Sequence, residues 1–117
     1  MNLESASNPL EVFLYWERNI PDQIFLSQPI NGVYRNWTYR QAGQECRRMA
    51  TALLKYNLPP QSHISILSKN CAHWIMADLA IWMARHISVP LYPTLSRTGI
   101  HQILEHSQSK ILFVGKL

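Results

Sequence analysis

Apolar residues recur at helical spacing near the start of the chain. Asn8 and Pro9 form a typical helix start, because an Asn side chain can accept from unpaired backbone N–H groups and Pro fits the first turn. The positions that follow in the same register are Leu10, Phe13, Leu14 and Glu17. Pro21 interrupts the pattern, since a residue before proline disfavours the helical region. We therefore predict a helix that begins at Pro9 and ends before Pro21.

Two short strands are predicted next. In the segment Gln23–Gln28, alternation places Ile24 and Leu26 on one face of a strand and the phenylalanine between them on the other. Asn31-Gly32 is a strong hairpin signal, because both residues tolerate positive φ. Val33–Trp37 then returns as the second strand of the hairpin.

A longer amphipathic helix is predicted from Tyr39 to about Tyr56, with Thr38 placed to cap it. Its apolar stripe consists of Ala42, Cys46, Met49, Ala50, Leu53 and Leu54. Its water-facing side carries Arg40, Glu45, Arg47, Arg48 and Lys55. The prolines in the segment 58–61 end this helix.

The second half of the chain alternates between strands and helices. Strands are predicted at His63–Ser68, Ile87–Tyr92 and Lys110–Val114, and helices at Cys71–His86 and from Ser96 onward. This βαβαβ order is typical of a parallel sheet with right-handed crossovers. We therefore predict an α/β fold, in which helices cover a parallel sheet that is preceded by a β-hairpin. A chain of 117 residues is long enough for one such domain.

The helix predicted at Cys71–His86 is apolar on almost every side. Its apolar residues are Trp74, Ile75, Met76, Ala77, Leu79, Ala80, Ile81, Trp82, Met83 and Ala84. A helix that is apolar all round is normally buried on every side. Because a three-strand sheet covers only one side, we expect that protein is missing around this helix and that Trp74 or Trp82 is exposed.

The charges argue against a nucleic-acid partner. The formal net charge is +4, but the basic residues are scattered and only Arg47 and Arg48 are adjacent. Scattered charge is typical of a solvated surface, whereas nucleic-acid binding needs a basic patch. We expect no nucleic-acid partner.

No membrane-spanning or secretory segment is predicted. The most apolar stretch, 74–83, is interrupted by Asp78 and is too short to span a bilayer. Residues 1–5 lack the basic and apolar regions of a secretory signal. We therefore expect a cytoplasmic protein, peripheral to a membrane at most, in which Cys46 and Cys71 are reduced and structural.

The candidate chemistry is sparse. The four glycines are isolated, and the turn 68–70 (SKN) lacks the glycines of a pyrophosphate-binding turn. No pair of histidines has the H-x-x-x-H spacing of metal ligands on a helix. The five histidines are His63, His73, His86, His101 and His106. Cys71 and His73 lie two positions apart on a helix, so we expect their side chains to point to different sides. The segment 107–110 matches S-x-x-K but lies where a helix runs into a strand, so we treat the match as chance.

Several segments nevertheless resemble the adenylate-forming acyl-CoA synthetases, and the long-chain fatty acid branch in particular. They are WTY (37–39), SKNCAHW (68–74), DLAI (78–81), SVPLYPTL (88–95), ILEHS (103–107) and FVGKL (113–117). The resemblance implies a parent enzyme that converts a fatty acid, ATP and CoA into acyl-CoA, AMP and pyrophosphate, with Mg²⁺ accompanying the ATP. It also implies that the fold is an incomplete N-terminal subdomain of that enzyme, with 8–62 as helix, hairpin and helix and 63–117 as the parallel βαβαβ unit.

The motifs that carry this family's chemistry have no match in the chain. The phosphate loop, the adenine-contacting segment, the ribose-binding aspartate and the C-terminal lysine all lie beyond Leu117 in the family. The resemblance therefore implies no catalytic, cofactor-binding or metal-binding residue here, and a chain that is inactive alone. It also implies the rest of the synthetase as a partner, or else self-association. Two alternatives stay open: a stand-alone α/β protein-interaction module and, less favoured, a small nucleotide-binding domain.

The chain departs from the family pattern at two positions where the family usually has glycine. One is Gln61-Ser62, just before the strand at His63, and the other is Arg85, after the apolar helix. If Arg85 needs positive φ, the missing glycine costs about 1 kcal/mol.

Overall fold

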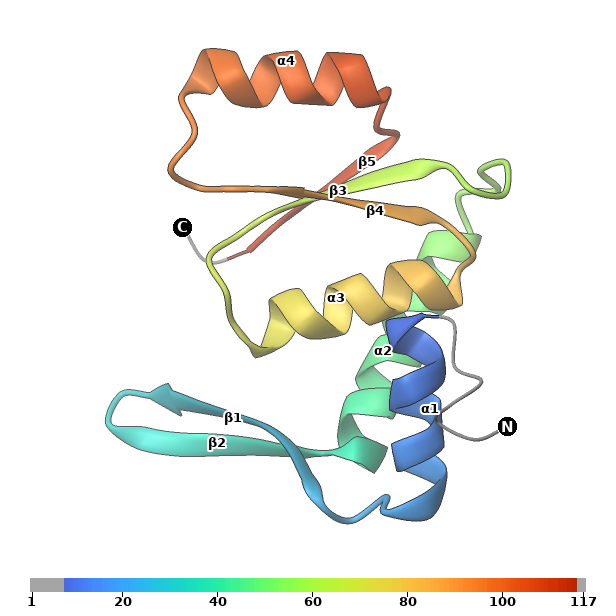
Figure 1. The fold of residues 1–117 in the computed structure, drawn as a ribbon, viewed down its shortest axis with the longest axis vertical. Coiled ribbons are helices and arrows are strands. Elements are labelled where there is room, and N and C mark those ends of the chain that lie inside the picture. Colours follow the sequence, from blue (N-terminus) through green and yellow to red (C-terminus); the bar gives the residue numbers. More distant parts are fainter. Residues whose placement is uncertain (1–7, 116–117) are drawn as a thin grey trace.

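The computed structural model describes residues 8–115 and confirms the predicted α/β architecture (Figure 1). Its elements in chain order are α1 (Pro9–Asn19), β1 (Ile24–Ile30), β2 (Val33–Thr38), α2 (Tyr39–Leu54), β3 (His63–Leu67), α3 (Ala72–Met83), β4 (Ile87–Leu91), α4 (Arg97–Ser107) and β5 (Ile111–Val114). None of the helices in the described part combines the length and the apolar character needed to cross a membrane.

The helix starts follow the predicted capping. Asn8 Oδ1 accepts from Glu11 N at 2.9 Å, which satisfies one of the unpaired amides of α1. Thr38 and Gln41 form a reciprocal capping box at the start of α2. Ser96 Oγ accepts from Gly99 N at 3.0 Å and begins α4. These local bonds explain why sequence patterns locate the helix starts well.

The hairpin contains an irregularity that alternation does not predict. Asn31 and Gly32 adopt φ values of 52° and 80°, which confirms the predicted turn. The β1–β2 register shifts between Ile24 and Leu26, however, so the two side chains do not share a face. Ile24 is exposed, whereas Phe25 and Leu26 both pack against the core. The predicted pairing of Ile24 with Leu26 on one face is therefore wrong.

Helix α2 presents most of its predicted stripe to the core. Ala42, Cys46, Ala50 and Leu53 are buried. Leu54 was included in the predicted stripe but is 56% exposed, because α2 ends at this residue and the chain turns away. The helix therefore stops two residues earlier than its apolar pattern predicts.

The three later strands form a parallel sheet, as predicted. Their order in the sheet, β4-β3-β5, is a finding of the structure. Helix α3 covers one face of this sheet, and α4 lies on the other (Figure 1). Ile64, Ile66 and Phe113 point toward α3 and join its core. No residue of α4 is fully buried, so the α4 face is the more loosely covered one.

Helix α3 is better covered than its sequence suggests. Met76, Ala80 and Ile81 are completely buried, because α2 and α1 pack on the side of α3 that faces away from the sheet (Figure 1). Trp74 is only partly buried, and Trp82 is 38% exposed. The expected exposure of a tryptophan on this helix is therefore found at Trp82, whereas the idea that protein is missing around the helix stays a prediction.

Two residues at the start of the sheet adopt the left-handed conformation that favours glycine. They are Gln61 with φ of 63° and Arg85 with φ of 64°. Gln61 N donates to Arg85 O at 2.8 Å, and Ile87 N donates to Ser62 O at 2.9 Å. These bonds hold the chain in register as β3 and β4 begin. The expectation that Arg85 needs positive φ is confirmed.

We predict that Arg85→Gly stabilises the protein by about 0.5–1 kcal/mol. Glycine removes the steric strain of a left-handed side-chain residue, and this gain exceeds the extra freedom that it gives the unfolded chain. Urea denaturation measures the change in the free energy of unfolding.

The matched control is Ala52→Gly, because Ala52 is an exposed residue inside α2. There glycine has no strain to relieve and should cost about 1 kcal/mol. A loss of stability in Arg85→Gly as large as that of the control would contradict the assignment of strain.

Candidate functional site

The arrangement of the sheet identifies one place as the natural ligand site. From β3 the chain crosses to β4 on one side, and it later returns to β5 on the other side of β3. Open parallel sheets bind their ligands outside the carboxyl ends of the strands, where the direction of winding reverses. In this fold that point lies beyond the ends of β3 and β5, near Ser68 and Gly115.

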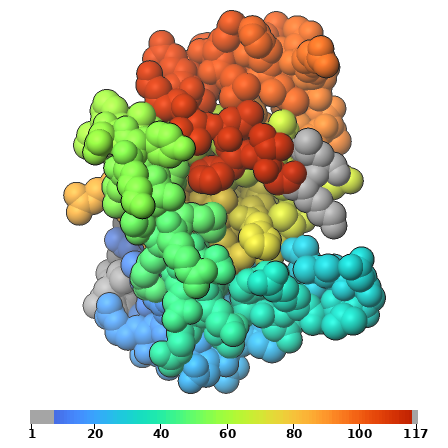
Figure 2. All heavy atoms as spheres, turned by 180° about the vertical axis from the view of Figure 1, so that it is seen from behind, coloured from blue at the N-terminus to red at the C-terminus, as the bar shows by residue number. Residues whose placement is uncertain are grey.

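A cavity of about 370 Å³ occurs at this point. Its lining consists of Gln28, Met49, Ile66, Ser68, Cys71, His73, Trp74, Ala77, Phe113, Val114 and Gly115. Figure 2 shows the hollow from behind, with α3 in yellow between α2 in green, β5 in red and the hairpin in cyan. Most of the lining is apolar, and a few polar groups lie among it. Such a lining is typical of small-molecule sites.

Ser68 and Gly115 both line this cavity, which we call the crevice, and they approach each other closely. Gly115 N donates to Leu67 O at 3.0 Å and continues the β5 ladder past Val114. A Cβ at position 115 would lie 2.6 Å from Ser68 Oγ and 2.9 Å from Ser68 Cβ. Position 115 therefore requires glycine because no side chain fits against Ser68.

The start of α3 borders the crevice, but its Ala72 amide already has a hydrogen-bond partner. The Cys71 side chain makes no capping bond, and Ala72 N donates instead to Gln28 Oε1 of the hairpin at 2.7 Å. While this bond is in place, the Ala72 amide cannot donate to a phosphate at the helix start. The turn 68–70 also has no glycine, so the backbone cannot form the cradle that a pyrophosphate needs.

A second cavity of about 380 Å³ adjoins the first across Trp74 and Ser68. It lies beyond the ends of β3 and β4 and is lined by Ser68, Lys69, Asn70, Trp74, Pro90, Leu91, Tyr92, Pro93 and Thr94. Lys69 is the one cation among the residues that line the two cavities. One cation and a few uncharged polar groups provide little charge for binding a triphosphate.

Residues 13–117 match the sequence pattern of the family described as AMP-binding enzyme. The chain belongs to the AMP-binding enzyme family. The helices, the hairpin and the parallel sheet of the described part, and the crevice at the ends of β3 and β5, therefore all lie within the matched region of a member of this family.

The curated relatives confirm the predicted resemblance to the long-chain fatty acid branch. The chain is 31% identical over 101 residues to long chain acyl-CoA synthetase 1 of Arabidopsis thaliana, which covers 86% of this chain and 14% of that protein. It is 28% identical over 97 residues to the long-chain-fatty-acid–CoA ligase FadD15 of Mycobacterium bovis, covering 83% of this chain and 16% of the relative. The chain thus spans about one seventh of the length of these relatives.

Solved structures confirm the fold. The fatty acid AMP ligase from Legionella pneumophila superposes with a TM-score of 0.83 at 19% sequence identity, over 97% of this chain and 21% of that chain. The N-terminal subdomain of Klebsiella oxytoca NpsA gives a TM-score of 0.78 at 19% identity, over 91% of this chain and 26% of that chain. The fold therefore corresponds to part of an N-terminal subdomain of the adenylate-forming enzymes.

The residues that the sequence singled out make contacts with neighbouring side chains and backbone. Cys71 Sγ lies 3.8 Å from Ser68 Oγ, while the His73 ring packs edge-on against Trp37 at 5.7 Å, and both residues line the crevice. Ser107 is the last residue of α4, and its hydroxyl contacts Leu104 O and Ser109 Oγ. Within residues 8–115, no three His, Cys, Asp or Glu side chains are placed to hold a metal ion.

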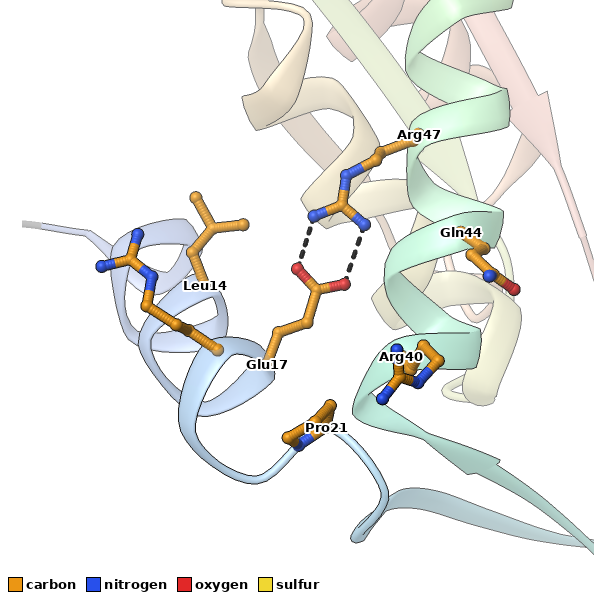
Figure 3. Close-up of a pocket in the computed structure, with 7 residues that line it drawn as sticks. Leu14, Glu17, Pro21, Arg40, Gln44 and Arg47 are labelled. Atoms are coloured by element: carbon orange, nitrogen blue, oxygen red, sulfur yellow. Dashed lines mark hydrogen bonds and ion pairs between the residues drawn. The ribbon is translucent and has the colours of Figure 1, made fainter.

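A surface hollow of about 440 Å³ between α1 and α2 is lined by Arg18, Arg40 and Arg47 (Figure 3). Arg40 is paired with Asp22. Glu17 and Arg47 form a two-bond ion pair across the hollow, and this pairing raises the pKa of Arg47. A Cβ at Gly43 would lie 1.7 Å from Glu17 Oε2, so this glycine leaves room for the pair. The Glu17–Arg47 pair therefore joins α1 to α2 across the hollow.

The Cys46 thiol is buried in the core between α2 and α3. Burial raises the pKa of Cys46 from 9.0 to about 12, because the core disfavours the thiolate. Its Sγ contacts Met76 O at 3.4 Å, where the neutral thiol can donate. This thiol is an apolar packing group and no nucleophile.

We predict a loss of stability at alkaline pH that depends on Cys46. The folded pKa lies above the unfolded one, so the contribution of the thiol is complete below about pH 9 and is lost as pH rises toward about 12. Between about pH 8 and about pH 10, the wild type should lose about 1.4 kcal/mol more unfolding free energy than Cys46→Ala.

Urea denaturation at the two pH values measures this difference, and Cys71→Ala is the control. Cys71 lies outside the buried core cluster, so its variant controls for the loss of a thiol as such. Equal pH dependence of the wild type and Cys46→Ala would show that the Cys46 thiolate is tolerated in the core.

Proposed function

We propose that this chain is the N-terminal segment of an AMP-forming long-chain fatty acid–CoA ligase and is inactive alone. The observation that carries the proposal is the family match over residues 13–117, combined with a span of only 14–16% of the long-chain relatives. The parent reaction is the conversion of a fatty acid, ATP and CoA into acyl-CoA, AMP and pyrophosphate. Residues 1–117 form part of one domain, with 8–62 and 63–117 as its two structural units.

The crevice supports the view that the nucleotide is bound elsewhere. The crevice and the adjoining cavity together are lined by one cation, Lys69, the turn 68–70 has no glycine, and the Ala72 amide is already bonded to Gln28. These residues do not fit ATP with Mg²⁺, so no step of the reaction is assigned to them. In the proposal, ATP, Mg²⁺ and CoA are bound by the remaining length of the synthetase, in the cytoplasm or at the periphery of a membrane.

A stand-alone α/β protein-interaction module is the second candidate function. The observation that favours it is the nearly complete cover of α3, which lets the described part hold a core of its own. The DNA that follows the codon for Leu117 separates the two candidates. A reading frame with the family's phosphate loop supports a split or interrupted synthetase, and unrelated sequence supports the module.

We predict that the purified chain catalyses no fatty-acid-dependent exchange between ATP and pyrophosphate. Positioning and charge stabilisation of the phosphates supply most of such a rate enhancement, and the crevice residues do not fit those phosphates. The assay uses labelled pyrophosphate with and without a long-chain fatty acid. A complete long-chain fatty acid–CoA ligase is the positive control. Exchange well above the rate without protein would overturn the proposal.

We also predict that the purified chain self-associates at tens of micromolar, unless the rest of the synthetase is present. Leu112 and Val114 of β5 are 38% and 59% exposed, and β5 is an unpaired edge of the sheet in the described part. An apolar edge strand of this kind is a template for pairing with another chain. Size-exclusion chromatography with light scattering measures the mass.

The variant Trp82→Lys tests the second exposed feature. Trp82 is 38% exposed, so lysine should be tolerated and should raise the yield of monomer. Loss of folding in this variant would show that Trp82 belongs to the core. A wild-type monomer that melts cooperatively would favour the interaction module over the proposed segment of a synthetase.

A further inference from the structure

The β1–β2 hairpin carries an apolar tip away from the body of the protein (Figure 1). At the tip, Ile30 is paired with Val33, and Pro29 is paired with Tyr34. Ile30, Val33 and Tyr34 are 39%, 71% and 70% exposed. Successive side chains of a strand point to opposite faces, so these two pairs put apolar groups on both faces of the ribbon.

The base of the hairpin is fixed firmly to the body. Gln28 Oε1 accepts from Ala72 N at 2.7 Å, and Trp37 is buried against His73 of α3. The turn at Asn31 and Gly32 has positive φ at both residues, which suits the twist of a tight hairpin. The apolar tip is therefore presented on a well-anchored ribbon.

The charge around the tip is entirely positive. The sequence has no Asp or Glu between Gln23 and Gln44. The cation nearest the tip in sequence is Arg35, which follows Tyr34 directly and lies 4.5 Å over the ring of Trp37. The whole chain carries a formal net charge of +4. Nothing in the hairpin therefore repels an anionic surface.

We propose that the hairpin tip, residues 29–34, together with Arg35 behind it, is a contact site for anionic lipid membranes. A convex tip with apolar groups on both faces can bury them all only in a medium that encloses it. The interfacial region of a bilayer is such a medium. Tyr34 is suited to that depth because it has an apolar ring and a polar hydroxyl. Arg35 lies behind the tip, at the level where anionic headgroups attract cations. This contact goes beyond the proposed ligase function and does not depend on it, since lipid binding needs no catalysis.

The test is flotation of the full chain with vesicles of phosphatidylcholine and phosphatidylglycerol in about equal amounts. Flotation is preferred to sedimentation because self-associated protein does not float. The wild type should float with these vesicles, and less with phosphatidylcholine alone. Val33→Asp should weaken the binding about tenfold or more, since it puts a carboxylate among the inserted groups. Circular dichroism checks that the variant is folded.

The matched control is Ile24→Asp. Ile24 lies on the same strand as the tip and is 55% exposed, but it is at the base of the hairpin. This variant makes the same change of charge and should bind vesicles like the wild type. Equal weakening by the two variants would overturn the proposal, because it would indicate a general effect of charge.

Two other outcomes would also overturn the proposal. One is a wild type that floats with neither kind of vesicle. The other is a Val33→Asp variant that floats like the wild type, which would show that the tip does not contact the membrane. The pyrophosphate exchange assay is independent of vesicle binding, so failure of one proposal is distinguishable from failure of the other.

Discussion

Burial of helix α3 is the constraint on which the other contacts of this fold depend. The helix is apolar on nearly every side, so it is stable in water only when neighbours cover it all round. The sheet covers one side, and α2 and α1 cover the other. Small residues of α2, such as Ala42 and Cys46, allow α2 to approach closely. Truncating a fully buried side chain such as Ile81 would cost about 2–5 kcal/mol, a large share of the stability of a small domain.

The same constraint explains how the hairpin is attached. Cys71, at the start of α3, makes no side-chain capping bond, and the hairpin supplies one through Gln28. Trp37 is buried beside His73 on the first turn of α3. These contacts join parts of the chain that are distant in sequence, since Gln28 and Ala72 are 44 positions apart. The hairpin and α3 therefore stabilise each other, and the hairpin tip remains exposed as a consequence of this attachment at its base.

The features that were predictable from sequence are local ones. The caps at Asn8, Thr38 and Ser96, the turn at Asn31-Gly32 and the βαβαβ order all depend on residues close together in the chain. The features that were not predicted depend on distant neighbours. The bulge at Ile24, the exposure of Leu54 and the cover that α2 gives to α3 were missed for this reason. The crevice was missed as well, because its lining combines the hairpin, α2, α3 and β5, which no short motif connects. The turn 68–70, which follows a strand and precedes a helix, was the one available signal.

The two edges of the parallel sheet differ in a way that bears on the rest of the molecule. Pro90 lies in the middle of β4 and has no N–H group, so it is tolerated because β4 is an edge strand. The same missing donor hinders any further strand from pairing beside β4. On the other edge, β5 has no proline, and its Leu112 and Val114 side chains are exposed on the α4 face. Helix α4 has no fully buried residue, so it does not cover that part of the sheet.

A sheet with one hindered edge and one open apolar edge is suited to extension in one direction only, past β5. The crevice at the ends of β3 and β5 lies directly beside that open edge, so whatever pairs with β5 would also complete the wall of the crevice.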